Sequence, residues 1–509
     1  MKNNSAFLLA AVLGIAIGAL SVGTYFTYKE KSHLLRSEYV DWRKLNLVLQ
    51  QVDAHYVDSV DRKKVSDAAI AAALSSLDPH SVYMPPVERQ ESEDDLSGGF
   101  DGIGIQFNVP ADTAVVIEVI PGGPSEKSGL LPGDRILQVD DKVIAGVNFP
   151  QDSMVRRMKG PAGTKVTITV GRAGERIPFE ITRGKIPVHS VSAAFMANDT
   201  TAYLRLGKFS RTTAKEVRDA LASLEKQGMK ELIFDIRDNS GGYFDQALMV
   251  SDLFLPADSL VVYMQGRSRK REDFRSSGRG AYRDLPLKIL VNEGSASSSE
   301  IFAGAMQDNH RAQIVGRRTF GKGLVQEPFD FTDGSGLRLT VARFYTPSGR
   351  CIQKPYSEDY DYEVLKRYSE GEMVEADSMK LSKGGILPDL FVPLDTTRAT
   401  QFYIQCNRKA TAMRFASNYF DMHRSEFESI DEYSELLTYF RTSGIEKAFL
   451  DYARRVDGLT PSGSEWADTK DYMLTQVYAL VGRYSRLGDN AFYHIYLNID
   501  DCYKAAIAQ

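Results

Sequence analysis

The stretch of sequence that says most about the fold runs from Val291 to Glu300 and reads Val-Asn-Glu-Gly-Ser-Ala-Ser-Ser-Ser-Glu. An apolar strand leads here through small residues into a helical pattern that begins at Ser297. The same order occurs twice upstream, where apolar strands at 202–206 and 232–236 each precede a helical pattern. Apolar strands that alternate with helices predict a layered α/β domain with parallel strand pairing.

A serine in this tight turn would lie beside unpaired helix N–H groups, which could stabilise an oxyanion. The alternative interpretation is helix capping, because Glu300 follows Ser297 by three residues, as in a capping box. A nucleophilic serine also needs a base. His310 and His80 are candidates, but no GxSxG elbow is present, and Lys322 in a glycine-rich loop is the better one.

The loop from Gly316 to Lys322 also matches the GxxxxGK pattern of a phosphate-binding loop. Gly323 stands where Ser or Thr would bind magnesium, and no helical pattern follows, so nucleotide binding is disfavoured. A second glycine turn, Gly241-Gly242, also lies between a strand and a helix. Its N–H groups could bind a carbonyl oxygen, or the pair could be an ordinary turn.

Residues 98–185 have a different texture, with short β-rich runs separated by Gly, Pro and Asp, which predicts a small independent module. Its segment Gly102-Ile103-Gly104-Ile105 opens a strand. Such a loop could direct N–H groups at a terminal carboxylate while the strand edge accepts a peptide. Residues 396–509 read as helices rich in Tyr and Phe.

Composition narrows the class of protein further. The 509 residues are 43% hydrophobic and 25% charged, which is typical of several folded domains. Sixty-two basic against 67 acidic residues give a net charge of −5, so nucleic acid is a poor candidate partner. The three cysteines are far apart and suggest neither a disulfide framework nor a zinc cluster.

The amino terminus contains an uncharged run from Phe7 to Phe26, long enough to cross a bilayer as a helix. The run is longer than the apolar region of a usual signal peptide, and it ends in an aromatic pair instead of the small residues of a cleavage site. We therefore expect an uncleaved membrane anchor.

Taken together, these motifs resemble the carboxyl-terminal processing proteases, serine proteases with a Ser-Lys dyad and an inserted PDZ domain. The resemblance covers residues 43–395. It rests on a series of motifs in one order: Leu77 to Ser81, Gly102 to Ile105, Pro132-Gly133-Asp134, Asp235-Ile236-Arg237 with Asn239 and Gly241-Gly242, Ser295 to Glu300, Thr319 to Gly323 with Gln326, Tyr345 to Arg350, and Gly385 to Asp389.

The resemblance implies Ser297 as the nucleophile, Lys322 as the base and Gln326 as the supporting residue. It implies oxyanion donors at the N–H of Ser298 and of Gly241 or Gly242, and peptide binding at Gly102, Ile103, Gly104 and Ile105. The family usually has Ala where this chain has Ser298. No metal or organic cofactor is implied.

The expected fold is an α/β core of the ClpP/crotonase type, with an inserted PDZ domain, an N-terminal helical segment and a C-terminal all-helical extension. The expected boundaries are 1–30 for the anchor or signal segment, 31–97 for N-terminal helices, 98–186 for the PDZ domain, 187–395 for the protease core and 396–509 for the helical extension.

We therefore expect an endopeptidase anchored in the inner membrane, with its catalytic region periplasmic or otherwise extracytoplasmic. Its partners would be protein or peptide substrates with free, apolar carboxyl termini, and it could form a homo-oligomer. The alternatives are a catalytically inactive PDZ adaptor and a nucleotide-driven enzyme that uses the Gly316 loop.

Overall fold

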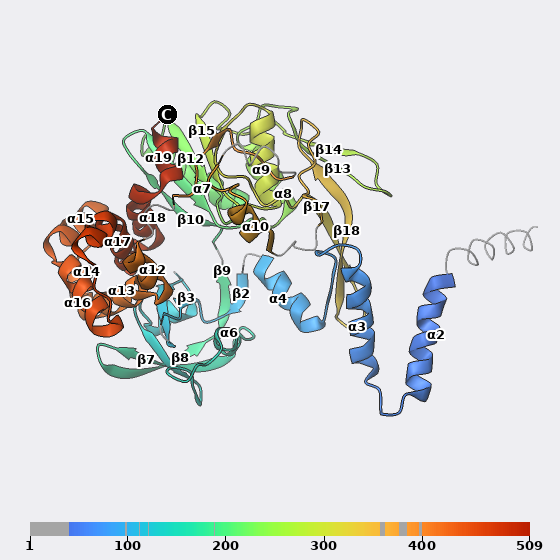
Figure 1. Cartoon of the computed structure of the whole chain (residues 1–509), viewed down its shortest axis with the longest axis horizontal. Coiled ribbons are helices and arrows are strands. Elements are labelled where there is room, and N and C mark those ends of the chain that lie inside the picture. The colour runs from blue at the N-terminus through green and yellow to red at the C-terminus, as the bar shows by residue number, and fades with distance from the viewer. Residues whose placement is uncertain are drawn as a thin grey trace, which may run out of the picture. The chain divides into compact units, whose positions relative to one another are not determined.

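The computed structural model describes residues 40–96, 99–110, 112–120, 122–187, 189–356, 362–375, 384–395 and 400–508 (Figure 1). It divides into two compact units, 1–77 and 78–509. The expected anchor, residues 7–26, lies outside the described residues. Among the helices of the described ranges, none combines the length and apolar character needed to span a bilayer.

The first unit contains two described helices, α2 (Val40–His55) and α3 (Arg62–Ser75). Helix α3 begins after Asp61, whose side chain accepts a hydrogen bond of 3.0 Å from the N–H of Lys64 and so caps the helix. The guanidinium of Arg62 donates to Asp53 of α2 at 2.7 Å, which links the two helices.

The β-rich module was expected from the short strands and turns after residue 98, and the structure confirms it. One sheet has the order β3-β4-β5-β7-β8, with β6 beside β5, and β2 pairs with β9. The inward side chains Val116, Ile136, Ile168 and Met154 are fully buried and form its core. Its elements are β2 (Gly99–Gly102), β3 (Ile105–Asn108), β4 (Ala114–Val119), α5 (Pro124–Ser128), β5 (Arg135–Val139), β6 (Lys142–Val143), α6 (Gln151–Met158), β7 (Lys165–Arg172), β8 (Glu175–Thr182) and β9 (Gly184–Pro187).

The α/β region that follows has the predicted alternation and the predicted parallel pairing. Its sheet has the order β10-β11-β12-β15-β16-β19, in which β10 is antiparallel and the other strands are parallel. Its elements are β10 (Val191–Met196), β11 (Thr201–Leu206), α7 (Thr213–Lys226), β12 (Glu231–Asp235), α8 (Phe244–Asp252), β15 (Leu287–Val291), α9 (Ser298–Asp308), β16 (Gln313–Gly316) and β19 (Leu390–Phe391).

A second sheet, which the sequence patterns did not predict, has strands from distant parts of the chain. Its path is β1-β18-β13-β14, and β17 also pairs with β18. Two further helices belong to this part of the chain. The elements are β1 (Val82–Met84), α4 (Pro86–Leu96), β13 (Leu260–Gln265), β14 (Glu272–Arg275), β17 (Leu324–Asp330), β18 (Gly336–Tyr345) and α10 (Glu363–Ser369).

The C-terminal region is helical and packs on the rest of the same unit (Figure 1). Val115 and Ile117 of β4 join the aromatic core of these helices, while α19 lies against β15 and β16. The guanidinium of Arg237, after β12, pairs with Asp500 at 2.6 Å. The helices are α12 (Gln401–Arg408), α13 (Thr411–Met422), α14 (Arg424–Phe427), α15 (Tyr433–Thr442), α16 (Ile445–Asp457), α17 (Gly463–Arg483), α18 (Gly488–Tyr496), η2 (Leu497–Ile499) and α19 (Asp501–Ile507).

Candidate active site

Ser297 occupies a strained position between β15 and α9. Its φ of 54° and ψ of −113° lie in a region that residues with a Cβ rarely adopt. It precedes the first residue of α9, where helix N–H groups lack partners within the helix and the helix dipole is positive. Strain of this kind persists only where the surrounding structure imposes it, and it is enriched at functional sites.

The hydroxyl groups of the neighbouring serines hold the adjacent glycine turn in place. Ser295 donates to the carbonyl of Ile236 at 2.8 Å, and Ser299 donates to that of Asn239 at 2.8 Å. Ser298 donates to the carbonyl of Gly242 at 3.0 Å. These three hydroxyls therefore have structural partners in the 236–242 turn, which distinguishes them from the half-buried Ser297.

The glycine turn approaches Ser297 so closely that a side chain would not fit. A Cβ on Gly241, whose φ is +101°, would lie 2.8 Å from the Cβ of Ser297 and 3.0 Å from the nitrogen of Ser298. The N–H of Gly241 donates to the side chain of Asn239 at 2.9 Å. Within the described ranges, the N–H groups of Gly242 and Ser298 have no acceptor, so both are available to donate hydrogen bonds to an oxyanion.

Glu300 connects the serine turn to the lysine loop. Its Oε2 accepts the N–H of Ser297 at 2.9 Å and the N–H of Lys322 at 2.8 Å. Its Oε1 accepts the N–H of Gly321 at 2.7 Å and the hydroxyl of Thr319 at 2.5 Å. The side chain is fully buried, and burial raises its pKa while these four donors oppose the rise. The capping interpretation of Glu300 was therefore only part of its role.

The environment of Lys322 favours the neutral form of its side chain. Burial lowers the pKa of its ammonium group, and the positive charge of Arg338 lowers it further, against Glu300 and Asp78, which raise it. The flanking glycines allow the loop to pack closely, because a Cβ on Gly323 would lie 2.5 Å from the nitrogen of Gln353. Burial is therefore the main cause of the lowered pKa of Lys322.

Arg317 and Arg318 are close to Lys322 in the sequence, but the positive charge that lowers the pKa of the lysine is that of Arg338 on β18. Arg317 pairs with Glu293 at 2.9 Å. Arg318 pairs with Glu372 at 2.6 Å and is buried beneath the segment that includes α10. Their charges are therefore compensated locally, which sequence proximity to Lys322 could not reveal.

Gln326 lies on β17. Strand β18 pairs both with β17 and with β1, the strand that follows the 78–81 turn. Its Nε2 donates to the carbonyl of His80 at 2.6 Å. In the same turn, Asp78 accepts the hydroxyl of Ser81 at 2.6 Å, and these hydrogen bonds hold its pKa below the usual range although burial raises it. The structure thus brings the Asp78-Pro79-His80-Ser81 motif to the lysine loop.

The two histidines considered as alternative bases are not placed as Lys322 is. His310 follows the end of α9, whereas Ser297 precedes its start, so a helix of 11 residues, about 16 Å long, separates them. His80 enters the network described above through its backbone carbonyl. The Gly316 loop leads into strand β17 and not into a helix, which agrees with its rejection as a phosphate-binding loop.

The Gly102–Ile105 loop of the β-rich module, predicted from the sequence to bind peptides, presents unpaired backbone donors. The carbonyls of Ile103 and Gly104 accept the N–H groups of Ser125 at 2.9 Å and Ile120 at 3.1 Å. Their own N–H groups have no acceptor in the part of the chain that the structure describes. Gly104 has a φ of +80°, which turns the loop before edge strand β3.

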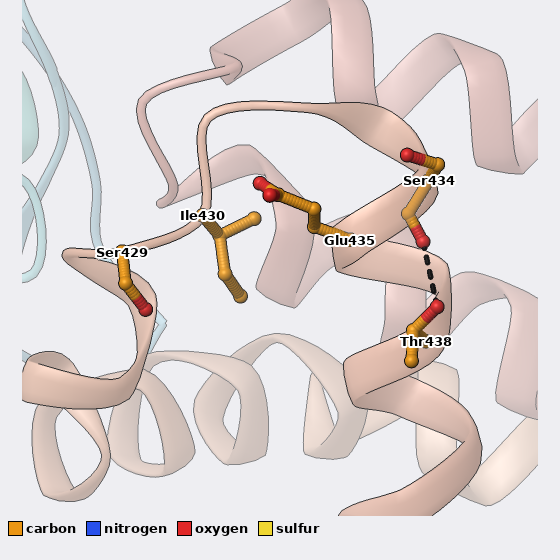
Figure 2. Close-up of a pocket in the computed structure, with 5 residues that line it drawn as sticks. All are labelled: Ser429, Ile430, Ser434, Glu435 and Thr438. Atoms are coloured by element: carbon orange, nitrogen blue, oxygen red, sulfur yellow. Dashed lines mark hydrogen bonds between the residues drawn. The ribbon is translucent and has the colours of Figure 1, made fainter.

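A shallow hollow on the C-terminal helices is lined by Ser429, Ile430, Ser434, Glu435 and Thr438 (Figure 2). The Thr438 hydroxyl donates to the carbonyl of Ser434 at 2.9 Å, and the Glu435 carboxylate accepts the N–H of Glu432 at 3.1 Å as a helix cap. Because these polar groups have local helical partners, and none of the predicted site residues lines the hollow, we assign it no chemistry.

Comparison with known families matches three regions of the chain. Residues 200–364 match peptidase family S41, residues 102–182 match the PDZ domain, and residues 402–485 match a family of unknown function. The carboxy-terminal processing protease CtpA of Bacillus subtilis is 33% identical over 372 residues, which cover 73% of this chain and 78% of that protein. The carboxyl-terminal-processing protease of Synechocystis is 38% identical over 294 residues, covering 56% and 68% of the two chains.

Among solved structures, the photosystem II D1 C-terminal processing protease is 28% identical, with a TM-score of 0.40 and coverage of 69% of this chain and 87% of that one. A peptide complex of the PDZ domain of a Vibrio cholerae carboxy-terminal protease is 31% identical, covers 18% and 99%, and has a TM-score of 0.17. The family match over residues 200–364 and the 33% identity to the Bacillus subtilis protease show that the chain belongs to peptidase family S41, among the carboxyl-terminal processing proteases. It is a serine-type peptidase with a PDZ domain.

Three interactions around Lys322, those with Glu300, Arg338 and Asp78, were missed by the reasoning from sequence. The link from Glu300 to the lysine loop, and the charges of Arg338 and Asp78 near Lys322, depend on contacts between distant segments. The capping-box spacing did single out Glu300, but it carries no information on a second partner.

Proposed function

We propose that this chain is an endopeptidase in which Ser297 is the nucleophile and Lys322 is the general base. The neutral Nζ of Lys322 accepts the proton of the Ser297 hydroxyl, and Oγ attacks the substrate carbonyl. As the tetrahedral intermediate collapses, the lysine returns the proton to the leaving amine. A water molecule, deprotonated in the same way, then hydrolyses the acyl ester and releases Ser297.

The observation that carries this proposal is the shared hydrogen-bond acceptor. Because one carboxylate oxygen of Glu300 accepts the N–H groups of both Ser297 and Lys322, the backbones that carry nucleophile and base lie side by side. The lowered pKa of Lys322 favours the neutral amine that the mechanism needs.

Supporting groups follow from the same geometry. The N–H groups of Ser298 and Gly242 are the oxyanion donors, since the N–H of Gly241 already serves Asn239. We assign Gln326, whose Nε2 donates to the carbonyl of His80, to the orientation of the lysine. The second candidate function is a catalytically inactive PDZ adaptor. Such an adaptor would have no need for a lysine with a lowered pKa at position 322.

The PDZ domain is proposed to capture the carboxyl terminus of the substrate. Unpaired N–H groups at Ile103 and Gly104 would pair with the terminal carboxylate, and edge strand β3 would accept the peptide as an added strand. The half-buried Ile105 packs with the module's apolar core, which favours an apolar last residue.

We further infer the domain division 1–30, 31–97, 98–186, 187–395 and 396–509, with a core of the ClpP/crotonase type. The uncharged 7–26 run supports an inner-membrane anchor and an extracytoplasmic catalytic region. Assembly into a homo-oligomer remains a prediction. Full-length protein should stay with membranes after a high-salt wash, whereas recovery in the soluble fraction with a new amino terminus near residue 25 would contradict the anchor.

The function is tested by incubating the full-length protein with unfolded substrate proteins. Ser297→Ala and Lys322→Ala should each abolish cleavage while retaining capture of free-carboxyl peptides. Ser299→Ala is the matched control, because its hydroxyl only holds the glycine turn, and it should lose at most about tenfold. Cleavage by Ser297→Ala at the wild-type rate would overturn the proposal, and capture without cleavage by the wild type would favour the adaptor.

A further inference from the structure

A hollow of about 450 Å³ lies where the PDZ domain, the start of the α/β core and the C-terminal helices meet. Strands β3 and β4 contribute Gln106 and Glu118. His189 comes from the segment before β10. Arg486, Asp489 and Asn490 come from the residues around the start of α18.

Glu118 is the carboxylate of this hollow that lacks a counter-ion. Within the described ranges it makes no hydrogen bond and no ion pair, and it is half-buried, so burial raises its pKa. Asp489 raises that pKa further, while Arg483 and His189 oppose the rise. A half-buried carboxylate without a partner is unfavourable, and a bound cation would relieve this cost.

The other charged groups around Glu118 already have partners. Arg483 is paired with Asp489 at 2.6 Å, and Arg486 with Asp431 at 3.0 Å on an exposed surface. His189 lies 4.0 Å from Glu216. Glu118 is therefore the carboxylate of the hollow whose negative charge is left without a counter-ion.

The strand register relates this hollow to the proposed peptide groove. Gln106 lies directly opposite Glu118 in the β3–β4 pair, so their side chains share one face of the sheet. Among the strands that the structure describes, none lies beside the other edge of β3. A peptide added there with its carboxylate at the Gly102–Ile105 loop would run antiparallel to β3, because its last residue lies at the start of that strand.

Side chains of an added strand alternate between the two faces of the sheet. The last residue of the peptide would lie beside Ile105, on the face that packs with the apolar core of the PDZ domain. The penultimate residue would then lie beside Gln106, which is exposed, on the face that carries Glu118.

We propose that the hollow is a subsite for a basic side chain, lysine or arginine, at the penultimate position of the substrate, selected by the charge of Glu118. The inference rests on the proposed capture of carboxyl termini. It gives the helical extension a part in substrate selection, because Arg486 and Asp489 also line the hollow.

The test uses full-length Ser297→Ala protein and fluorescent peptides that share an apolar last residue and carry Lys, Ala or Glu before it. Fluorescence anisotropy should show that the Lys peptide binds about fivefold more tightly than the Ala peptide. Glu118→Gln should reduce this ratio to about one without changing the affinity for the Ala peptide. The unchanged affinity for the Ala peptide would also show that the PDZ domain of the variant is folded.

Glu175→Gln is the matched control, since Glu175 is exposed on β8 at the opposite edge of the same sheet, and it should keep the Lys preference. A Lys preference that survives in Glu118→Gln would overturn the subsite. An amidated Ala peptide separates the two proposals. If amidation weakens binding but Lys and Ala peptides bind equally, the subsite fails and capture stands. If amidation has no effect, both fail.

Discussion

Ser297 and Lys322 donate their backbone N–H groups to the same oxygen of Glu300, at 2.9 and 2.8 Å. The carboxylate therefore aligns the turn before α9 with the loop before β17. Since Glu300 is fully buried and also accepts Gly321 and Thr319, small movements of either segment would break hydrogen bonds that water cannot replace.

Replacing Glu300 tests this alignment. In Glu300→Gln one carboxylate oxygen becomes an NH₂ group, which faces N–H donors and cannot accept from them. We expect kcat to fall at least about a hundredfold with a smaller change in KM, as in a loss of positioning. Steady-state kinetics measures this, and thermal unfolding followed by circular dichroism checks that the variant is folded. Unchanged kcat in a folded variant would contradict the alignment.

The cleavage rate should depend on pH through Lys322. Its pKa is lowered in the folded enzyme, so the neutral base is present above that lowered value and is lost as the pH falls through it. Arg338→Gln removes a charge that lowers this pKa. We therefore expect the midpoint of the kcat/KM profile to move to higher pH in this variant. A midpoint that stays in place, or moves to lower pH, would show that Arg338 does not tune the base.

The close approach of Gly241 predicts a strong effect of a single methyl group. Gly241→Ala would place Cβ 2.8 Å from that of Ser297 at a φ of +101°, so we expect cleavage to be lost. Gly174→Ala is the matched control, because it has a φ of +85° with nothing within 4 Å, and it should cost only about 1 kcal/mol of stability. Cleavage assays on both variants decide this, and full activity of Gly241→Ala would refute the geometry of the turn.

The ion pair of Arg237 with Asp500 predicts that the last helix stabilises the core. Both side chains are largely buried, and Arg237 also pairs with Asp235 at 2.6 Å. Asp500→Ala removes one of the two carboxylates that pair with Arg237, and we expect the free energy of unfolding to fall by about 3 kcal/mol. Chemical denaturation measures this loss. As a control, Asp431→Ala removes the exposed partner of Arg486 and should cost at most about 1 kcal/mol.

The local parts of the fold and site could be predicted from the sequence, whereas the long-range parts could not. Apolar strands followed by helices gave the parallel pairing of β11, β12 and β15, because each unit is continuous in the chain. The antiparallel sheet that carries Gln326 joins segments 246 residues apart, as its hydrogen bond to His80 shows. No local periodicity encodes such a pairing.

The same distinction applies to the charges near Lys322. Arg317 and Arg318 are close to Lys322 in sequence but pair with Glu293 and Glu372, whereas the charge that lowers the pKa of Lys322 is that of Arg338 on β18. Partner choice among charges depends on burial and on side-chain direction, and neither can be read from spacing alone.

The central claim, that Lys322 activates Ser297, is tested most directly by labelling with a fluorophosphonate, which reacts with an activated serine hydroxyl. Mass spectrometry of the labelled full-length protein should locate the adduct on Ser297. The labelling rate should fall at least about a hundredfold in Lys322→Ala and remain near that of the wild type in Ser299→Ala. An adduct on another serine, or unchanged labelling of Ser297 in Lys322→Ala, would contradict the account.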